Sequence, residues 1–209
     1  MLPRVLAIVP VKGRDGKNRL DRLLGPDERA RLVEAMLADV VAACRDARSV
    51  ERTMVVTPDP EAAPADVDVL EDDGRGHSAA VGRALGDERA RDGVVVVMGD
   101  CPLVTGELLD RLVAAADPVA LAPAADGGVN ALALRDPAAI EPPFGVSDAA
   151  RDLLGKARAA GIAAAVVEEP ELAFDVDKPS DVWRLRQDGG PTRTHRVLEE
   201  MLPPTGGLL

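Results

Sequence analysis

Three segments of this chain place charged side chains where they can do chemistry, and the first of them is strongly basic. Residues 10–22 form a glycine-containing loop with five cations, Lys12, Arg14, Lys17, Arg19 and Arg22, although the whole chain carries a net charge of −11. A basic loop of this kind between a strand and a helix is typical of a phosphate cradle, because glycines let the backbone approach the anion. The spacing is not that of a P-loop, which also needs a Lys-Ser/Thr pair. Taken alone, the segment is equally consistent with a solvated basic loop.

The other two segments supply carboxylates. Asp100 lies just after a run of four valines, and Asp175 and Asp177 lie two positions apart beyond the last apolar run. In an extended segment, residues two apart point to the same side. Mg²⁺ prefers carboxylate and phosphate oxygens, so these aspartates are candidate ligands of a divalent cation. A helix cap or a turn is the alternative interpretation at each position.

These segments need a sheet that brings strand ends together. Short apolar runs predict strands at 5–9, 53–57, 93–98, 119–122, 130–134 and 162–167, with a weaker candidate at 67–70. Helical spacing predicts helices at 27–44, 78–91, 108–116, 147–160 and 181–187. The valine run is apolar on both faces, which is typical of a central strand in a covered sheet. The alternation predicts an α/β fold whose mostly parallel mixed sheet has helices on both faces and ligands at the carboxyl ends of its strands.

Length and composition bound the class of protein. The 209 residues predict one domain at 1–188, followed by an extension at 189–209 that we expect to be partly flexible. An acidic chain lacks the positive electrostatic potential that attracts nucleic acid. One Trp, two Phe and no Tyr are also too few aromatic side chains to stack on several bases. Two cysteines are too few for a disulfide framework, and no apolar run is long enough to span a membrane. We therefore expect a cytoplasmic protein without nucleic-acid or membrane partners; the oligomeric state is open.

Seven short motifs, taken in order, resemble a known enzyme family. They are Pro10-Val-Lys12 with Lys17-Asn-Arg19-Leu20, then residues 31–37, 55–59, 99–103, 127–132, 144–145 and 175–179. Between about residues 5 and 187 the chain resembles the 2-phospho-L-lactate or phosphoenolpyruvate guanylyltransferases of coenzyme F-420 biosynthesis (CofC type). The resemblance implies a Rossmann-like nucleotidyltransferase fold and Mg²⁺ as cofactor. It implies as partners GTP and a small three-carbon phosphoacid, whose phosphate attacks the α-phosphate of GTP and releases pyrophosphate.

The resemblance also implies roles for particular residues. The metal-binding aspartates of the family fall on Asp100 and Asp175, with Asp177 as a further candidate ligand, and Lys17 joins Asp100 and Asp175 in catalysis. The positions expected to bind the nucleotide are Pro10, Lys12, Lys17, Arg19, Gly76 and Ser78. Those expected near the acceptor are Asn130, Gly145, Ser147 and Asp148.

The chain departs from the family's pattern in both halves of the site, and the acceptor half matches less well than the nucleotide and metal half. His77-Ser78 stand where the family has Leu-Asn, Val129 stands where it often has Thr, and Asp148 where it has Ser. A small shift of the loop puts Ser147 in place of that serine; without it, Asp148 repels an anionic acceptor. Two alternatives follow: a transferase of the same fold with another acceptor, such as molybdopterin or a sugar phosphate, and a non-catalytic nucleotide-binding relative.

Overall fold

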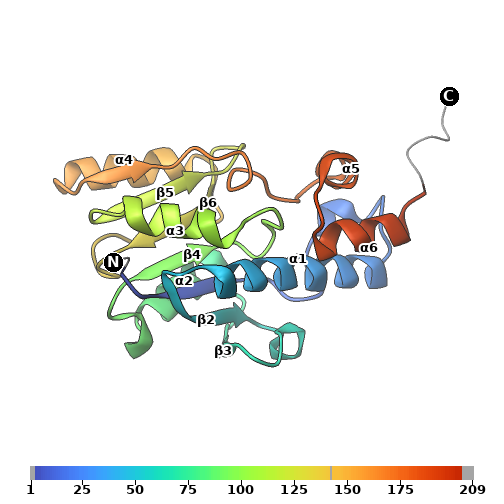
Figure 1. The fold of residues 1–209 in the computed structure, drawn as a ribbon, viewed down its shortest axis with the longest axis horizontal. Helices are drawn as coiled ribbons and strands as arrows, with labels where there is room; N and C mark the ends of the chain where they lie inside the picture. Colours follow the sequence, from blue (N-terminus) through green and yellow to red (C-terminus); the bar gives the residue numbers. More distant parts are fainter. Residues whose placement is uncertain (1–2, 142, 204–209) are drawn as a thin grey trace.

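A single mixed sheet forms the centre of the molecule in the computed structural model, which describes residues 3–141 and 143–203 (Figure 1). Within those residues the sheet has seven strands, in the spatial order β3 (Asp68–Glu71), β2 (Val50–Thr57), β1 (Val5–Pro10), β4 (Val94–Val97), β6 (Val129–Leu134), β5 (Val119–Pro123) and β7 (Ala164–Val166). Neighbouring strands are parallel, except that β6 is antiparallel to both β4 and β5. The mostly parallel mixed sheet predicted from the sequence is confirmed.

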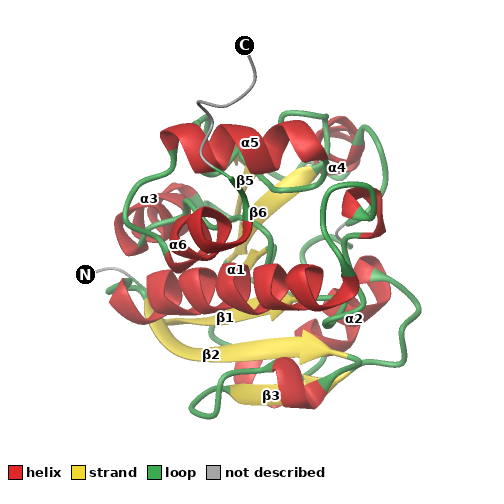
Figure 2. Cartoon of the chain, turned by 90° about the vertical axis from the view of Figure 1, so that its right-hand side faces the viewer, coloured by secondary structure: helices red, strands yellow, loops and turns green. Residues whose placement is uncertain are grey.

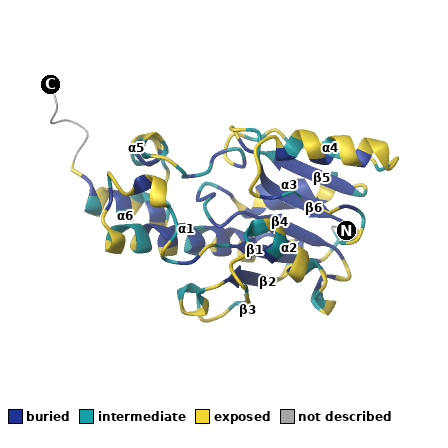
Figure 3. Ribbon diagram, turned by 180° about the vertical axis from the view of Figure 1, so that it is seen from behind, coloured by how far each residue is buried: buried dark blue, intermediate teal, exposed yellow. Residues whose placement is uncertain are grey.

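Helices cover both faces of this sheet, as predicted. Helices α1 (Pro26–Asp46) and α3 (Gly106–Ala115) pack on one face, and α2 (His77–Leu85) and α4 (Ala149–Ala159) pack on the other. The all-valine strand β4 shows why: Val95 and Val97 belong to the first apolar cluster, while Val94 and Val96 belong to the second. The buried strands and the exposed outer side of α4 are apparent in Figure 3. Both sheet faces are therefore removed from water, which leaves the strand ends for a site.

Helix α1 is longer than β1, the strand that precedes it in the chain. Its 21 residues span about 31 Å, against about 20 Å for the six residues of β1. Its amino-terminal half extends past the carboxyl edge of the sheet and packs there against α6 (Arg193–Met201), which in turn contacts α5 (Pro179–Asp188). Figure 2 shows α6 between α1 and α5. The short η1 turn (Asn18–Leu20) lies in the same region. These elements share a third apolar cluster that includes Leu20, Leu32, Met36, Val182 and Leu198. We call residues 17–39 and 176–202 the overhang.

The predicted elements are all present, with differences at their ends. Helix α2 stops at Leu85, well before residue 91, because Gly86 forms its C-cap and a separate 3₁₀ turn follows at Glu88–Ala90. Helix α4 starts two residues later than predicted, since Asp148 has left-handed backbone angles (φ 61°, ψ 17°). Strand β7 is shorter than the predicted run 162–167.

The carboxyl-terminal extension is the largest difference from the sequence-based reading. Residues 193–201, for which no helix was predicted, form α6 and share the overhang's apolar cluster with α1. The domain limit at residue 188 stays a prediction, and the flexibility expected for the end of the chain falls mostly on 204–209, outside the described residues. None of the helices described has the length and apolar character to cross a membrane. Cytoplasmic location stays a prediction.

Candidate active site

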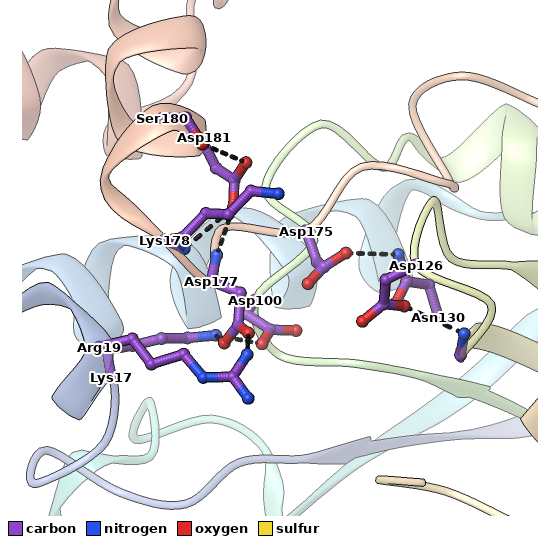
Figure 4. A network of polar contacts seen from close by, with 11 residues as sticks. Lys17, Arg19, Asp100, Asp126, Asn130, Asp175, Asp177, Lys178, Ser180 and Asp181 are labelled. Atoms are coloured by element: carbon purple, nitrogen blue, oxygen red, sulfur yellow. Dashed lines mark hydrogen bonds and ion pairs between the residues drawn. The ribbon is translucent and has the colours of Figure 1, made fainter. Parts of the chain in front are cut away.

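The loops that follow β1 and β4 meet at the carboxyl edge of the sheet. The Gly99 amide donates a hydrogen bond to the Pro10 carbonyl (3.3 Å), and the Met98 amide donates to the Asn130 carbonyl (2.9 Å). The Val176 amide donates to the Asp100 carbonyl (3.0 Å), which brings the late acidic segment to the same place. The structure thus gathers the basic loop and both acidic segments, as the sequence predicted, and Figure 4 shows their side chains.

Lys17 is the buried cation of this site. Its Nζ pairs with the carboxylate of Asp100 and, at 3.3 Å, with that of Asp177, and only 11% of its side chain is exposed. Burial alone would lower the pKa of Lys17, but the charges of Asp100 and Asp177 outweigh it and raise that pKa above its ordinary value. Lys17 is therefore a fixed positive charge at neutral pH.

Asp175 carries the most perturbed carboxyl group of the site. Its Oδ1 accepts a hydrogen bond from the Asn130 amide (3.3 Å). Burial, followed by the charge of Asp100, raises the pKa of Asp175 to about 6, although Asn130 and Lys17 act in the opposite direction. A cation beside Asp175 would offset the burial and the charge of Asp100 that disfavour its ionised form.

Asp177 faces cations rather than the other two aspartates. It pairs with Lys17 and with Arg19, and these charges lower its pKa even though burial acts to raise it. No three acidic, histidine or cysteine side chains of the described residues are grouped closely enough to hold a metal ion. The metal-binding roles predicted for Asp100, Asp175 and Asp177 stay predictions. Mg²⁺ commonly takes only one or two protein carboxylates and completes its shell with substrate phosphates and water.

In the basic loop, one cation anchors the backbone through an ion pair and another is exposed to solvent. Arg14 forms two short hydrogen bonds with Asp59 after β2 (2.8 and 3.0 Å), so this cation anchors the loop. Gly13 has a φ of +81°, and a Cβ there would lie 2.8 Å from the Cβ of Asp59, so only glycine fits at this close approach. Pro10 is buried as the last residue of β1, while Lys12 is exposed and forms no ion pair with any described residue. Lys12 is thus available to an anion.

The predicted nucleotide and acceptor segments touch each other. Gly76 is the N-cap of α2 (φ 104°), and the Ser78 hydroxyl donates a hydrogen bond to the Phe144 carbonyl (2.7 Å). A Cβ added to Gly145 would lie 3.8 Å from the ring of His77. The start of α2 and the loop before α4 therefore form one wall beside the acidic centre.

Ser147 and Asp148 are both exposed on the turn that leads into α4. The Asp148 carboxylate pairs with Arg151 (3.0 Å), and the carbonyl of Gly127 accepts a hydrogen bond from the amide of Ala150 (3.2 Å). The turn is thereby tied to the β5–β6 hairpin that carries Asn130. The site roles predicted for Ser147 and Asp148 stay predictions.

Comparison with known proteins identifies the family. The family model described as "Guanylyl transferase CofC like" matches residues 5–202, nearly the whole chain. The chain belongs to this family. It is similar to the phosphoenolpyruvate guanylyltransferase of Sphaerobacter thermophilus, with 39% identity over 190 residues that cover 86% of this chain and 91% of the relative. It is also similar to the 2-phospho-L-lactate guanylyltransferase of Haloarcula marismortui, with 37% identity over 201 residues that cover 95% and 94%.

Solved structures place the CofC-like chain in the nucleotidyltransferase fold. The 2-C-methyl-D-erythritol 4-phosphate cytidylyltransferase of Thermus thermophilus superposes with a TM-score of 0.60 at 20% identity, covering 93% of this chain and 98% of that one. A nucleotidyl transferase from Methanothermobacter superposes with a TM-score of 0.60 at 22% identity, covering 88% and 96%. At these identities the likeness shows the fold alone, and it agrees with the fold class predicted from the sequence.

Three residues of this CofC-like site were missed by the sequence reasoning. Asp126, in the β5–β6 turn, adds negative charge beside Asp175 (Figure 4). Asp181 accepts hydrogen bonds from the amides of Asp177 and Lys178 (3.0 and 2.9 Å) and so fixes the segment before α5. Asp59 holds Arg14. The motif at residues 55–59 contained the signal for Asp59, whereas nothing in the sequence pairs Asp126 with a residue 49 positions away.

Proposed function

We propose that this chain transfers GMP from GTP to the phosphate of a small three-carbon phosphoacid and releases pyrophosphate, as in the coenzyme F-420 route that its family implies. The observation that carries this proposal is the pair Asp100 and Asp175, held at the carboxyl edge of the sheet beside the buried Lys17. The relatives named as guanylyltransferases support GTP as the donor. Their two named acceptors, phosphoenolpyruvate and 2-phospho-L-lactate, support the acceptor class.

The chemistry needs little covalent help from the protein. The acceptor's phosphate oxygen is already a nucleophile at neutral pH, so the barrier lies in aligning two anions and neutralising their charge. Asp100 and Asp175 would hold Mg²⁺, because burial and then the charge of Asp100 raise the pKa of Asp175, and a bound cation would offset both effects. When bound, Mg²⁺ supplies charge neutralisation and a template for the phosphates.

The protein's own cations do the remaining work. Lys17 stays protonated and lies between Asp100 and Asp177, so it can move between a carboxylate and a phosphate without changing its charge. Arg19 is oriented by Asp177, and Lys12 projects freely from the same loop. We assign these three cations to the triphosphate, which they neutralise and align for in-line attack.

The test is pyrophosphate release by the purified protein with GTP and Mg²⁺. Phosphoenolpyruvate, 2-phospho-L-lactate and 3-phosphoglycerate serve as acceptors, with ATP and CTP as donor controls. Release with GTP and one of these acids supports the proposal and names the acceptor. Release that continues at the same rate after EDTA treatment contradicts the metal assignment. Binding of GTP without release on any acid contradicts the acceptor class.

A further inference from the structure

His77 is a polar side chain in the wall of the site that the protein's described contacts do not use. It is the first residue of α2, it is half-buried, and its ring forms no hydrogen bond or ion pair within the part of the chain that the structure describes. One side of the ring lies against Gly145, where an added Cβ would be 3.8 Å from Cδ2 and 3.9 Å from Cβ of His77. The ring nitrogens of His77 are not among the buried side-chain atoms that lack a partner in the described residues, so they are open to water or to a ligand.

The charges around His77 show which way it faces. The groups that act on its ring are Lys12 and Lys17 of the basic loop, Asp100 after β4 and Asp72 after β3. All four lie at the carboxyl edge of the sheet, so the ring borders the place where the phosphates react. Burial, followed by the charge of Lys12, lowers the pKa of His77, and the neutral ring that results still has one N–H donor.

The neighbouring acceptor wall is poor in donors. Val129 is buried and has no polar side-chain atom, and Asp148 is an anion paired with Arg151. The side-chain amide of Asn130 donates one of its two N–H groups to Asp175 and keeps one for a ligand. An acid with a carboxylate and a phosphate needs several donors on this side, and the His77 ring beside Gly145 offers one in addition to the exposed Ser147 hydroxyl.

We propose that His77 binds the acceptor, its ring N–H donating a hydrogen bond to an anionic oxygen of the phosphoacid across Gly145. This inference rests on the proposed function and adds to it a determinant of acceptor affinity on the nucleotide side of the pocket. A guanine contact is the competing role for the same ring, and the kinetics separate the two.

The experiment compares His77→Leu and His77→Gln with the natural chain by steady-state pyrophosphate release, varying the acceptor at saturating GTP and then GTP at saturating acceptor. Loss of one hydrogen bond to a charged group raises the KM of the acceptor about 10- to 100-fold in His77→Leu. The KM of GTP and the unfolding midpoint stay unchanged. His77→Gln keeps an N–H donor near the position of Nε2, so it has a lower acceptor KM than His77→Leu.

Three results overturn the proposal: an unchanged acceptor KM in His77→Leu, a rise confined to the KM of GTP, and equal acceptor KM values in the two variants. Arg83→Leu, on the exposed side of the same helix, is the matched control and leaves both KM values unchanged. If the natural chain releases no pyrophosphate with any acid, the proposed function fails and this inference fails with it. If the natural chain turns over and His77→Leu equals it, the inference alone fails.

Discussion

The sheet and the overhang contribute different halves of the site. On the sheet side, Asp100 and Asn130 follow or lie in buried strands, and backbone hydrogen bonds between neighbouring loops fix them. On the overhang side, Lys17, Arg19 and Asp177 lie on turns that depend on a separate apolar cluster. The ion pair between Lys17 and Asp100 joins the two regions. The comparison shows that Asp100 and Asn130 are held by the sheet itself, while Lys17, Arg19 and Asp177 depend on how the overhang docks.

The largest expected effect comes from removing the charge on the sheet side. Asp100→Asn deletes a candidate metal ligand and the partner of Lys17, so turnover falls by at least about 100-fold, the cost typical of losing one transition-state electrostatic contact. The folded state persists, because Asp100 contributes its carbonyl rather than its side chain to the bond with Val176. Pyrophosphate release and circular dichroism measure the two properties.

The control for this variant lies at the other end of the same strand. Asp92→Asn removes an equal charge from an exposed residue just before β4, far from the carboxyl edge, and leaves turnover unchanged. Comparable losses of turnover in both variants would show that net charge, rather than the site, sets the rate.

The two regions differ in how much of their structure could be predicted from the sequence. The sheet side was predictable, because β-branched runs such as Val94–Val97 identify buried strands and the strand ends identify the edge that binds ligands. The expected position of Asp100 and Asp175 at that edge followed from this reasoning. The docking of the overhang was not predictable, because α6 buries only Thr194 and Leu198, and so few buried positions do not indicate which part of the chain they pack against. Its position depends on Asp39, a partner 155 residues away.

That partner gives the second prediction. Asp39 accepts hydrogen bonds from the amides of Arg193 and Thr194 (both 2.8 Å) and from the Thr194 hydroxyl (2.6 Å), so it caps the start of α6 from within α1. Asp39→Ala lowers the free energy of unfolding by about 2 kcal/mol. The unfolding midpoint falls by about 4–8 °C for a chain of this size.

Thermal unfolding measures this shift, and Glu34→Ala provides the reference. Glu34 lies on the same helix, is exposed, and forms no ion pair with any residue that the structure describes. An equal shift in the two variants would mean that Asp39 acts through the charge of α1 and not through α6. A normal midpoint for Asp39→Ala would show that the apolar cluster alone holds the overhang.

The sheet side has a buried counterpart of Asp39, which gives a prediction that depends on pH. Asp110 in α3 accepts hydrogen bonds from the Ser49 amide (2.8 Å), the Ser49 hydroxyl (2.7 Å) and the Arg48 amide (3.2 Å), and its side chain is 7% exposed. Burial alone would raise the pKa of Asp110, but these hydrogen bonds outweigh it and lower that pKa. The ionised form is therefore favoured in the folded state. Its contribution is complete above the unfolded pKa of about 4 and is lost as the pH falls through the folded value.

Asp110→Asn tests this contribution. At pH 7 the free energy of unfolding, measured with urea, drops by about 1–2 kcal/mol relative to the natural chain. The difference narrows at pH 3, because the natural chain then loses the same contribution. Other carboxyl groups titrate in both proteins and cancel in the difference. A gap that is equal at both pH values would place the effect in packing instead of in ionisation.

The smallest expected effect concerns the acceptor side, at the turn that leads into α4. Asp148 has left-handed backbone angles and pairs with Arg151 at the surface, so Asp148→Asn removes the charge while keeping a residue that tolerates this conformation. We expect the acceptor KM to fall about threefold, because a partly screened like charge next to an anion is worth less than 1 kcal/mol. Steady-state pyrophosphate release measures it, with the KM of GTP as the internal control. If the acceptor KM rises instead, Asp148 holds the turn through Arg151, and that rigidity outweighs the repulsion of an anionic acceptor.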